Sequence, residues 1–176
     1  NVALYKRRIF LFPRMKTCGW AGLGYIGGGD PWGISWINGY LSLIVMGHEL
    51  GHNFGLNHAR ALTCTSGTIG GTCNYNDSSV GAVYGDTADI MGNRFPGHFN
   101  AQEKEALGWL DTPSFPGITT VTENGTFDLP AYETLTPDFK AIRIPKTSPV
   151  TPNSTYYYFE YRQPIGFDAS LGSNLT

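Results

Sequence analysis

Three of the four histidines of this 176-residue chain fall in the run His48-Glu49-Leu50-Gly51-His52-Asn53-Phe54-Gly55-Leu56-Asn57-His58. Positions four apart lie on the same face of an α-helix, so the spacing predicts a helix that presents His48 and His52 together. Gly55 follows where a residue without Cβ can take the left-handed conformation that ends a helix. The turn at Gly55 would bring His58 back toward the first two histidines.

The spacing H-E-x-x-H-x-x-G-x-x-H is typical of a catalytic zinc site. Three imidazoles and no thiolate leave the fourth tetrahedral position for water, whereas structural zinc sites are closed. Glu49 lies roughly 100° around the helix from His48, so we expect it to act as the general base on that water during peptide hydrolysis. Core hydrogen bonds or a structural metal would leave Glu49 without a purpose. We therefore predict His48, His52 and His58 as zinc ligands.

The residues before the zinc run form the longest apolar stretch of the chain, Leu41–Met46. Because this stretch is apolar on nearly all sides, it predicts a helix buried in a core. It is much shorter than the roughly 20 residues that a membrane span requires. We therefore expect a soluble chain without a membrane span.

The extended zinc run resembles that of the metzincin metallopeptidases, which place a methionine in a tight turn beneath the metal. Met91 lies 33 residues after His58, among small and polar residues, and the resemblance implies that it is this Met-turn residue. Without the zinc run, a core role for Met91 would be the ordinary interpretation. Some metzincins add a tyrosine two residues later, but that residue is Asn93 here. We therefore expect no tyrosine ligand or donor from that position, and the sequence identifies no other donor.

More narrowly, the chain is similar to the gametolysin-type peptidases, secreted zinc endopeptidases that degrade extracellular-matrix and cell-wall glycoproteins. Beyond the zinc run, the similarity rests on the segments Trp20–Gly27, Asp89–Gly92, Phe99–Ala101, Leu107–Leu110 and Tyr156–Asp168. It implies an α+β fold with a metzincin-like zincin catalytic domain, in which a twisted mixed sheet accompanies the zinc helix and the Met-turn. We expect this domain in residues 1–112 and a β-rich C-terminal module in residues 113–176.

Local patterns add several elements to this outline. Arg8–Phe12 and Trp36–Ile37 are predicted as strands, and the resemblance makes the glycine-rich segment Trp20–Gly27 the edge strand above the substrate cleft. Its match to a dinucleotide-binding pattern lacks the helix that should follow, so we discard that interpretation. Asn100 and Glu103 have the spacing of a capping box, which predicts a helix over Ala101–Leu110. Strand-like alternation follows in 118–121, 126–129, 139–144 and 155–161.

Composition narrows the classes of partner. The chain has 12 basic and 14 acidic residues, a net charge of −2 and 41% hydrophobic residues. It therefore has no basic field for nucleic acid or anionic lipid. The predicted partner is a polypeptide substrate, by resemblance an extracellular-matrix or cell-wall glycoprotein. The fourth histidine, His98, stands before the predicted second helix, where a solvated or capping role is more common than a place in the cleft.

Several features indicate secretion. Four N-x-[S/T] sequons occur, at Asn76, Asn124, Asn153 and Asn174. Cys64 and Cys73 bracket a flexible loop that a disulfide would close, with a gain of about 2–4 kcal/mol, and Cys18 is left over. The chain also starts without an initiator methionine or signal-like segment, so we expect it to be a piece of a longer precursor.

Two alternatives to a peptidase stay open. The chain could be a matrix or adhesion module that keeps the peptidase fold without turnover, although such a module would be expected to have a damaged zinc run. It could also be a zinc amidase acting on a non-protein wall substrate. The amidase would share the chemistry and differ only in the shape of its pocket.

Overall fold

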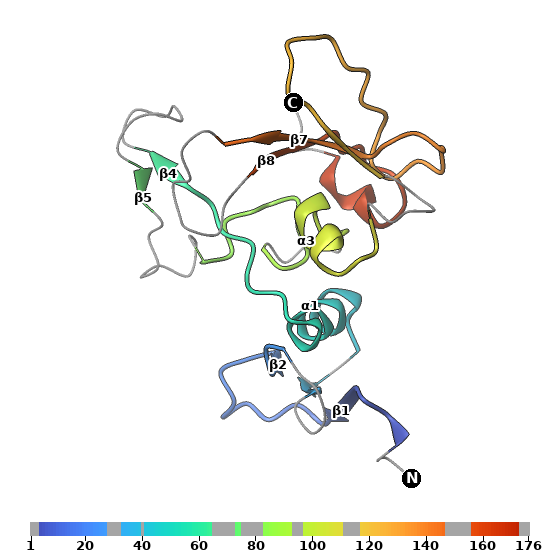
Figure 1. Ribbon diagram of the computed structural model, residues 1–176. Helices are drawn as coiled ribbons and strands as arrows, with labels where there is room; N and C mark the ends of the chain where they lie inside the picture. The colour runs from blue at the N-terminus through green and yellow to red at the C-terminus, as the bar shows by residue number, and fades with distance from the viewer. Residues whose placement is uncertain are drawn as a thin grey trace. The chain divides into compact units, whose positions relative to one another are not determined.

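The chain forms two compact units, Asn1–Gly97 and His98–Thr176 (Figure 1). The computed structural model describes residues 4–27, 33–39, 41–64, 73–74, 83–92, 97–110, 117–146 and 156–172. Its elements make an α+β protein with two small mixed sheets. The division falls after residue 97, before the second helix. A separately folding module at 113–176 therefore stays a prediction.

A three-stranded mixed sheet forms one layer of the first unit. Its strands are β1 (Arg8–Phe12), β2 (Gly22–Gly24) and β3 (Ile34–Asn38), in the order β1-β3-β2. Strand β1 runs parallel to β3, and β2 runs antiparallel to it. The predicted strand at Arg8–Phe12 and the glycine-rich edge strand are both present. The strand predicted at Trp36–Ile37 extends by residues on both sides.

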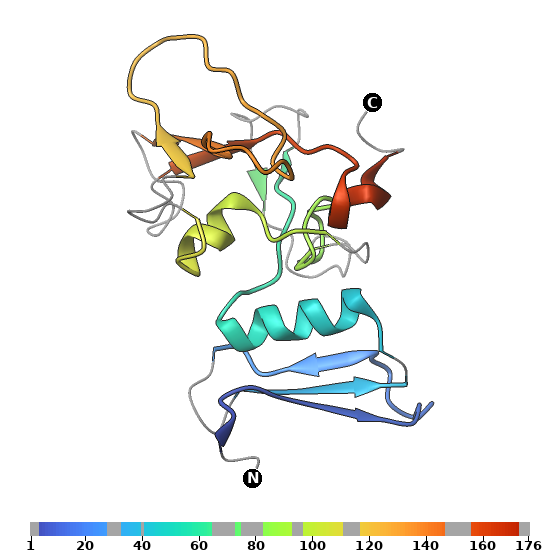
Figure 2. The same cartoon turned by 90° about the vertical axis from the view of Figure 1, so that its right-hand side faces the viewer.

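Helix α1 (Leu43–Phe54) lies along one face of this sheet (Figure 2). Side chains alternate across a strand, so Ser35 and Ile37 of β3 share one face of the sheet, and both are buried. The Ser35 hydroxyl oxygen on this face lies 3.2 Å from the Glu49 carbonyl oxygen. The helix ends as predicted at Gly55, which has a φ of 103° and donates its N–H to the His52 carbonyl.

The apolar stretch before the zinc run is less buried than predicted. Leu41 is 61% exposed and Leu43 is 57% exposed, and the fully buried residues of α1 are Glu49, Gly51, His52 and Asn53. The prediction of a helix buried on nearly all sides was therefore wrong for its first turn. The sheet of three short strands covers one side of the helix only. The apolar pattern of the sequence does not specify which helix residues face the sheet.

Asn53 joins the helix to the sheet. Its side chain is completely buried, and its amide nitrogen donates to the carbonyls of Tyr25 and Ile34 at 3.0 and 3.1 Å. Its amide oxygen accepts a hydrogen bond of 2.9 Å from the Ser35 hydroxyl. One side chain thus ties α1 to β3 and to the residue that follows β2.

Two short strands, β4 (Thr63–Cys64) and β5 (Cys73–Asn74), pair antiparallel and place Cys64 opposite Cys73. Cα atoms of opposed residues in such a pair are about 4.5–5.5 Å apart, within the range that a disulfide spans. Cys18 is a free, partly buried thiol. Of the four sequons, only Asn124 lies in the described part of the chain, and it is exposed in a loop.

The second unit contains the other mixed sheet, made of β6 (Ile118–Thr120), β7 (Ala141–Pro145) and β8 (Tyr156–Glu160). Helix α3 (Ala101–Ala106) contacts β8, and the 3-10 helix η2 (Gly166–Leu171) follows. Residues from α3, the sheet and the loops between them form the core: Ala101, Leu110, Ile118, Tyr132 and Ala141, with Tyr158 packed against them.

The predictions for the second unit were correct in part. Asn100 caps α3, since its side chain accepts the Glu103 N–H at 2.9 Å as the capping-box spacing predicts. The helix stops at Ala106, four residues before the predicted end, because Gly108 takes a φ of 69°. Residues 126–129 form no strand, so their alternation of side chains was misleading.

His98 belongs to a buried polar network of this unit. Its N–H donates to Asp168 at 2.9 Å, its carbonyl accepts from Arg162 at 3.2 Å, and Arg162 also pairs with Asp168 at 3.2 Å. Burial, and then the positive charge of Lys104, lower the pKa of His98 to about 4. The main chain of His98 makes these contacts, and the Nδ1 atom of its ring lies 3.2 Å from Lys104 Nζ. No helix in the described ranges has the length and apolar character needed to cross a membrane.

The fold predicts a specific effect for Asn53→Ala. Loss of the amide leaves buried polar groups without a partner, so the free energy of unfolding should fall by about 2 kcal/mol. Urea denaturation followed by tryptophan fluorescence measures this change. The control is Asn57→Ala, since Asn57 is exposed and its loss should change stability little. Equal stability of the two variants would contradict the role of Asn53.

Candidate metal centre and active site

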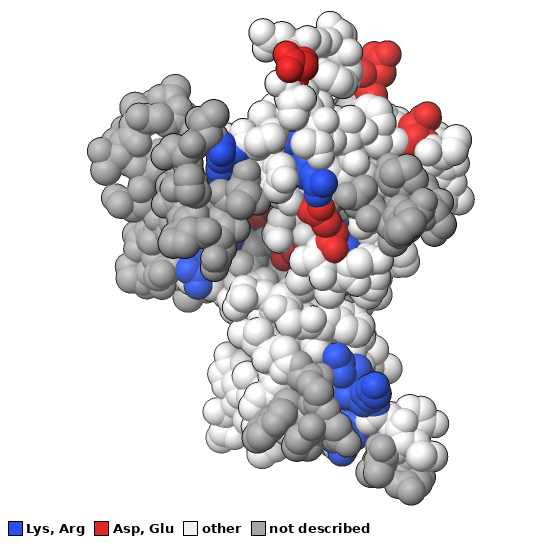
Figure 3. Space-filling view, in the orientation of Figure 1, with Lys and Arg blue, Asp and Glu red and all other residues white. Residues whose placement is uncertain are grey.

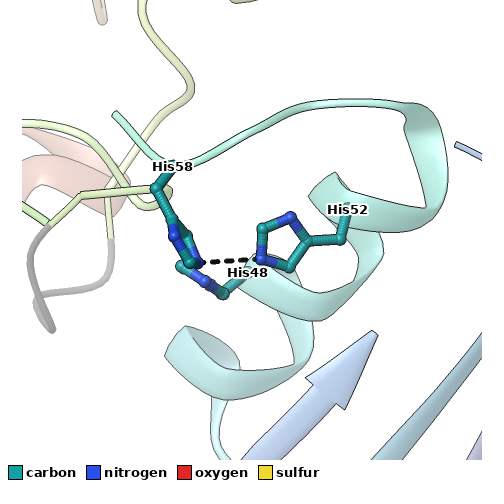
Figure 4. A group of neighbouring side chains, drawn as sticks. All are labelled: His48, His52 and His58. Carbon is teal, nitrogen blue, oxygen red and sulfur yellow. Dashed lines mark hydrogen bonds between the residues drawn. The ribbon is translucent and has the colours of Figure 1, made fainter. Parts of the chain in front are cut away.

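The structure brings the three histidines of the zinc run together (Figure 4). His48 and His52 stand one turn apart on α1, and His58 returns on the segment that follows the turn at Gly55. Each ring offers one nitrogen, and these three atoms lie within 4.8 Å of one another. The Nε2 atoms of His52 and His58 are 3.1 Å apart.

Main-chain carbonyls orient two of the rings. The Nδ1 atom of His48 lies 2.8 Å from the Ile90 carbonyl, and that of His52 lies 2.9 Å from the Leu56 carbonyl. A neutral imidazole that donates from Nδ1 carries its lone pair on Nε2. Such contacts are the usual outer hydrogen bonds of metal-binding histidines, because they fix the tautomer and the direction of the ring.

The surroundings of the three rings favour their neutral form, which can bind a cation. Burial lowers the pKa of all three histidines, to about 4 for His58, where the neighbouring histidines and Arg60 act in the same direction. A metal needs the neutral imidazole as its ligand. Burial of the rings therefore favours the protonation state in which they bind metal.

Zinc fits this donor set. Tetrahedral zinc at 2.0–2.1 Å from each nitrogen would hold two ligand nitrogens about 3.3 Å apart, close to the 3.1 Å between His52 and His58. Three imidazoles with no thiolate form the open arrangement of a catalytic site. The residues that could hold the ion are therefore His48, His52 and His58.

The side chain of Glu49 lies between its own helix, α1, and the edge strand β2. Its residue is 7% exposed. A Cβ added at Gly22 would lie 2.4 Å from its Oε1 atom, and one at Gly24 would lie 2.7 Å from its main-chain oxygen. Burial raises the pKa of Glu49 to about 7, and a hydrogen bond from the Gly24 backbone acts in the opposite direction. The two glycines of the edge strand thus allow the strand to approach this carboxylate directly.

The turn that contains Met91 contacts the histidine segment through its backbone. Met91 is completely buried and donates its N–H to the Asp89 carboxylate at 2.6 Å. Its carbonyl accepts from the Ala59 N–H at 3.0 Å, next to His58, and the preceding carbonyl of Ile90 faces His48. The tight turn predicted here is present, with Gly92 N–H donating to the Asp89 carbonyl. Asn93 lies outside the described residues.

Tyr84 is a neighbour of the histidines that the sequence did not identify as a site residue. Its ring centroid lies 4.1 Å from that of His58 and 5.7 Å from that of His48. Burial raises the pKa of Tyr84, and the charge of Glu49 acts in the same direction. No spacing rule links Tyr84 to the zinc run, so only the fold could show this contact. The fourth histidine, His98, lies in the second unit.

We expect zinc to bind through the three clustered histidines alone. Titration of chelator-treated protein with zinc in a calorimeter should show one site per chain. In His58→Ala the affinity should fall by more than the about 10- to 100-fold that the loss of an outer hydrogen-bond partner costs. His98→Ala is the matched control and should bind zinc as the wild type does. Similar losses in both variants would contradict this site.

A Cβ on the edge strand should disturb the contact between β2 and α1. Gly24→Ala would press against backbone atoms of Glu49, so we expect the free energy of unfolding to fall by about 1–3 kcal/mol. Gly19→Ala is the control, because a Cβ there meets nothing within 4 Å. Urea denaturation of the two variants measures this change. If Gly24→Ala is as stable as the wild type, β2 and α1 pack less closely than described.

Comparison with known proteins agrees with the geometry of the site. The family model for gametolysin peptidase M11 matches residues 2–176. The search of curated proteins and the search of solved structures gave no significant match. The match to the family covers nearly the whole chain, and the structure contains a three-histidine cluster of the kind that a zinc peptidase needs. The chain therefore belongs to the gametolysin peptidase M11 family of zinc metallopeptidases.

Proposed function

We propose that this protein is a metzincin-like zinc endopeptidase that cleaves polypeptides outside the cell, with Glu49 as its general base. The observation that carries the proposal is the convergence of three imidazole nitrogens within 4.8 Å beside a buried glutamate on the same helix. Membership of the peptidase family supplies the class of reaction.

In this proposal His48, His52 and His58 hold the zinc ion. The ion, when bound, polarises the scissile carbonyl and lowers the pKa of a water molecule to about 7. The carbonyls of Ile90 and Leu56 keep the rings in place, since they bond to the Nδ1 atoms. The same carbonyls tie the metal ligands to the turn at Met91 and to the end of α1. Met91 would thus serve as the Met-turn residue, a buried support beneath the ligands.

Glu49 is the residue that moves protons. Its carboxylate accepts a proton from the attacking water and delivers it to the nitrogen of the departing amine, so that no net proton is lost. The close approach of Gly22 and Gly24 limits the space in which the carboxylate can move. Restriction of a general base in this way is favourable, since catalysis requires that it lie within hydrogen-bond reach of its proton.

The edge strand β2 is the proposed site for the substrate backbone. In the sheet order β1-β3-β2, β2 pairs with β3 on one side only. An extended peptide could add to the other edge through main-chain hydrogen bonds. Because Gly22 and Gly24 carry no side chains, the peptide could approach closely to Glu49. Such binding recognises an extended backbone, which suits an endopeptidase.

An extracellular glycoprotein substrate is the finer part of the proposal. The register of β4 and β5 supports a disulfide between Cys64 and Cys73, a bond typical of secreted proteins. The exposed loop position of Asn124 suits glycosylation. On the face shown in Figure 3, most of the described surface is uncharged, and both acidic and basic groups are present. A substrate selected by backbone shape rather than by charge is consistent with this surface.

The test uses zinc-loaded protein and a denatured protein mixture, with cut sites identified by mass spectrometry. Wild-type protein should cleave peptide bonds, and a chelator should abolish cleavage. Glu49→Ala should bind zinc normally and lose roughly 10²- to 10⁴-fold in rate, the contribution of a general base. Glu123→Gln, at an exposed loop position, should cleave at the wild-type rate.

Each other outcome points to a different function. Zinc binding without cleavage of any protein would favour the silent matrix module, and cleavage of a non-protein amide alone would favour the amidase. Wild-type cleavage by Glu49→Ala would contradict the assigned base and leave the peptidase class intact.

A further inference from the structure

The aromatic ring of Tyr84 lies against the histidine cluster within the first unit. It is 4.1 Å from the ring of His58 and 5.7 Å from that of His48, between ring centroids. Tyr84 lies seven residues before Met91, on the opposite side of the Met-turn from Asn93. The ring thus reaches the site from a part of the chain that the zinc motif does not include.

The backbone next to Tyr84 is held close to the segment that carries His58. A Cβ added at Gly85 would lie 2.3 Å from the Cβ of Ala61, so the two backbones are in direct contact. Asp86 donates its N–H to the Ala59 carbonyl at 3.2 Å. These contacts join residues 85 and 86 to the residues just after His58. The residues that follow Tyr84 and those that follow His58 are therefore held together.

The hydroxyl of Tyr84 differs from those of Tyr132 and Tyr158. Tyr132 donates its hydroxyl to the Phe99 carbonyl at 2.9 Å, and Tyr158 donates to the Glu105 carboxylate. The Tyr84 hydroxyl makes no hydrogen bond with any residue that the structure describes. A hydroxyl with no partner among the described residues, on a ring that lies against His58, is available to a substrate.

We infer that the Tyr84 hydroxyl donates a hydrogen bond to the carbonyl oxygen of the scissile peptide bond as negative charge develops on that oxygen. The inference rests on the proposed function and identifies the donor that the sequence left open. No proton is transferred in this step: the phenol stays neutral, and the hydrogen bond strengthens in the transition state. A donor aimed at a developing oxyanion is among the largest contributions to acyl-transfer catalysis.

Tyr84→Phe tests the hydroxyl and keeps the ring beside His58. We expect kcat to fall by roughly 10²- to 10³-fold with little change in KM, as for the loss of one oxyanion donor. Zinc affinity measured by calorimetry should equal that of the wild type, because no ligand is changed. Tyr5→Phe is the matched control, since Tyr5 is 66% exposed and should keep wild-type kinetics. Tyr84→Leu should show at least the same loss in kcat.

A second measurement does not depend on turnover. A phosphinic peptide mimics the tetrahedral transition state, so zinc-loaded Tyr84→Phe should bind it more weakly by roughly the same factor as the loss in kcat. The amine-side product peptide, which does not contain the former scissile carbonyl, should bind both proteins equally.

The outcomes separate this inference from the proposed function. If wild type cleaves peptides and Tyr84→Phe matches it in kcat and in phosphinic-peptide affinity, the inference is wrong and the peptidase assignment stands. A loss of zinc affinity in Tyr84→Phe would also overturn it, because the hydroxyl would then act on the metal site itself. If zinc-loaded wild type cleaves no peptide, the proposed function fails and the inference fails with it.

Discussion

The direct contact between helix α1 and the edge strand β2 is the constraint on which the site depends. The helix carries two histidines and Glu49, and the strand can lie against it only because Gly22 and Gly24 have no side chains. Asn53 secures the same contact from the far end of the helix, through hydrogen bonds to the strands' main chain. Glu49, the two histidines of the helix and the edge strand are thus parts of one packing arrangement, and a change in any of them affects the others.

Main-chain carbonyls connect this arrangement to the rest of the first unit. Ile90, in the turn before Met91, and Leu56, just after the helix, each accept from the Nδ1 side of a histidine ring. The orientation of His52 therefore depends on a carbonyl within the zinc motif, and that of His48 depends on a carbonyl far along the chain. The turn before Met91 thus acts on the histidine cluster through the main chain of Ile90.

The sequence predicted what depends on local spacing. Residues 48–58 indicated a helix, its end at Gly55 and the meeting of three histidines, since these follow from helical periodicity and the conformational freedom of glycine. The cap at Asn100 followed for the same reason. Features that depend on distant contacts were not predictable: the position of Tyr84 beside His58, the exposure of Leu43 and the failure of residues 126–129 to form a strand. Tyr84 and His58 are 26 residues apart along the chain, and no pattern within a short window identifies such a contact.

The two ends of α1 are held unequally. Ser42 makes no side-chain cap at the first turn, where Leu43 is exposed. At the other end, the His52 carbonyl accepts N–H groups from both Gly27, at 2.7 Å, and Gly55, at 2.9 Å. We therefore expect thermal fraying of the helix to begin at Leu43 and the turn that carries His52 to open last. The arrangement of the histidines could therefore persist while the first turn of α1 is locally unfolded. Such an enzyme would keep its metal in that state.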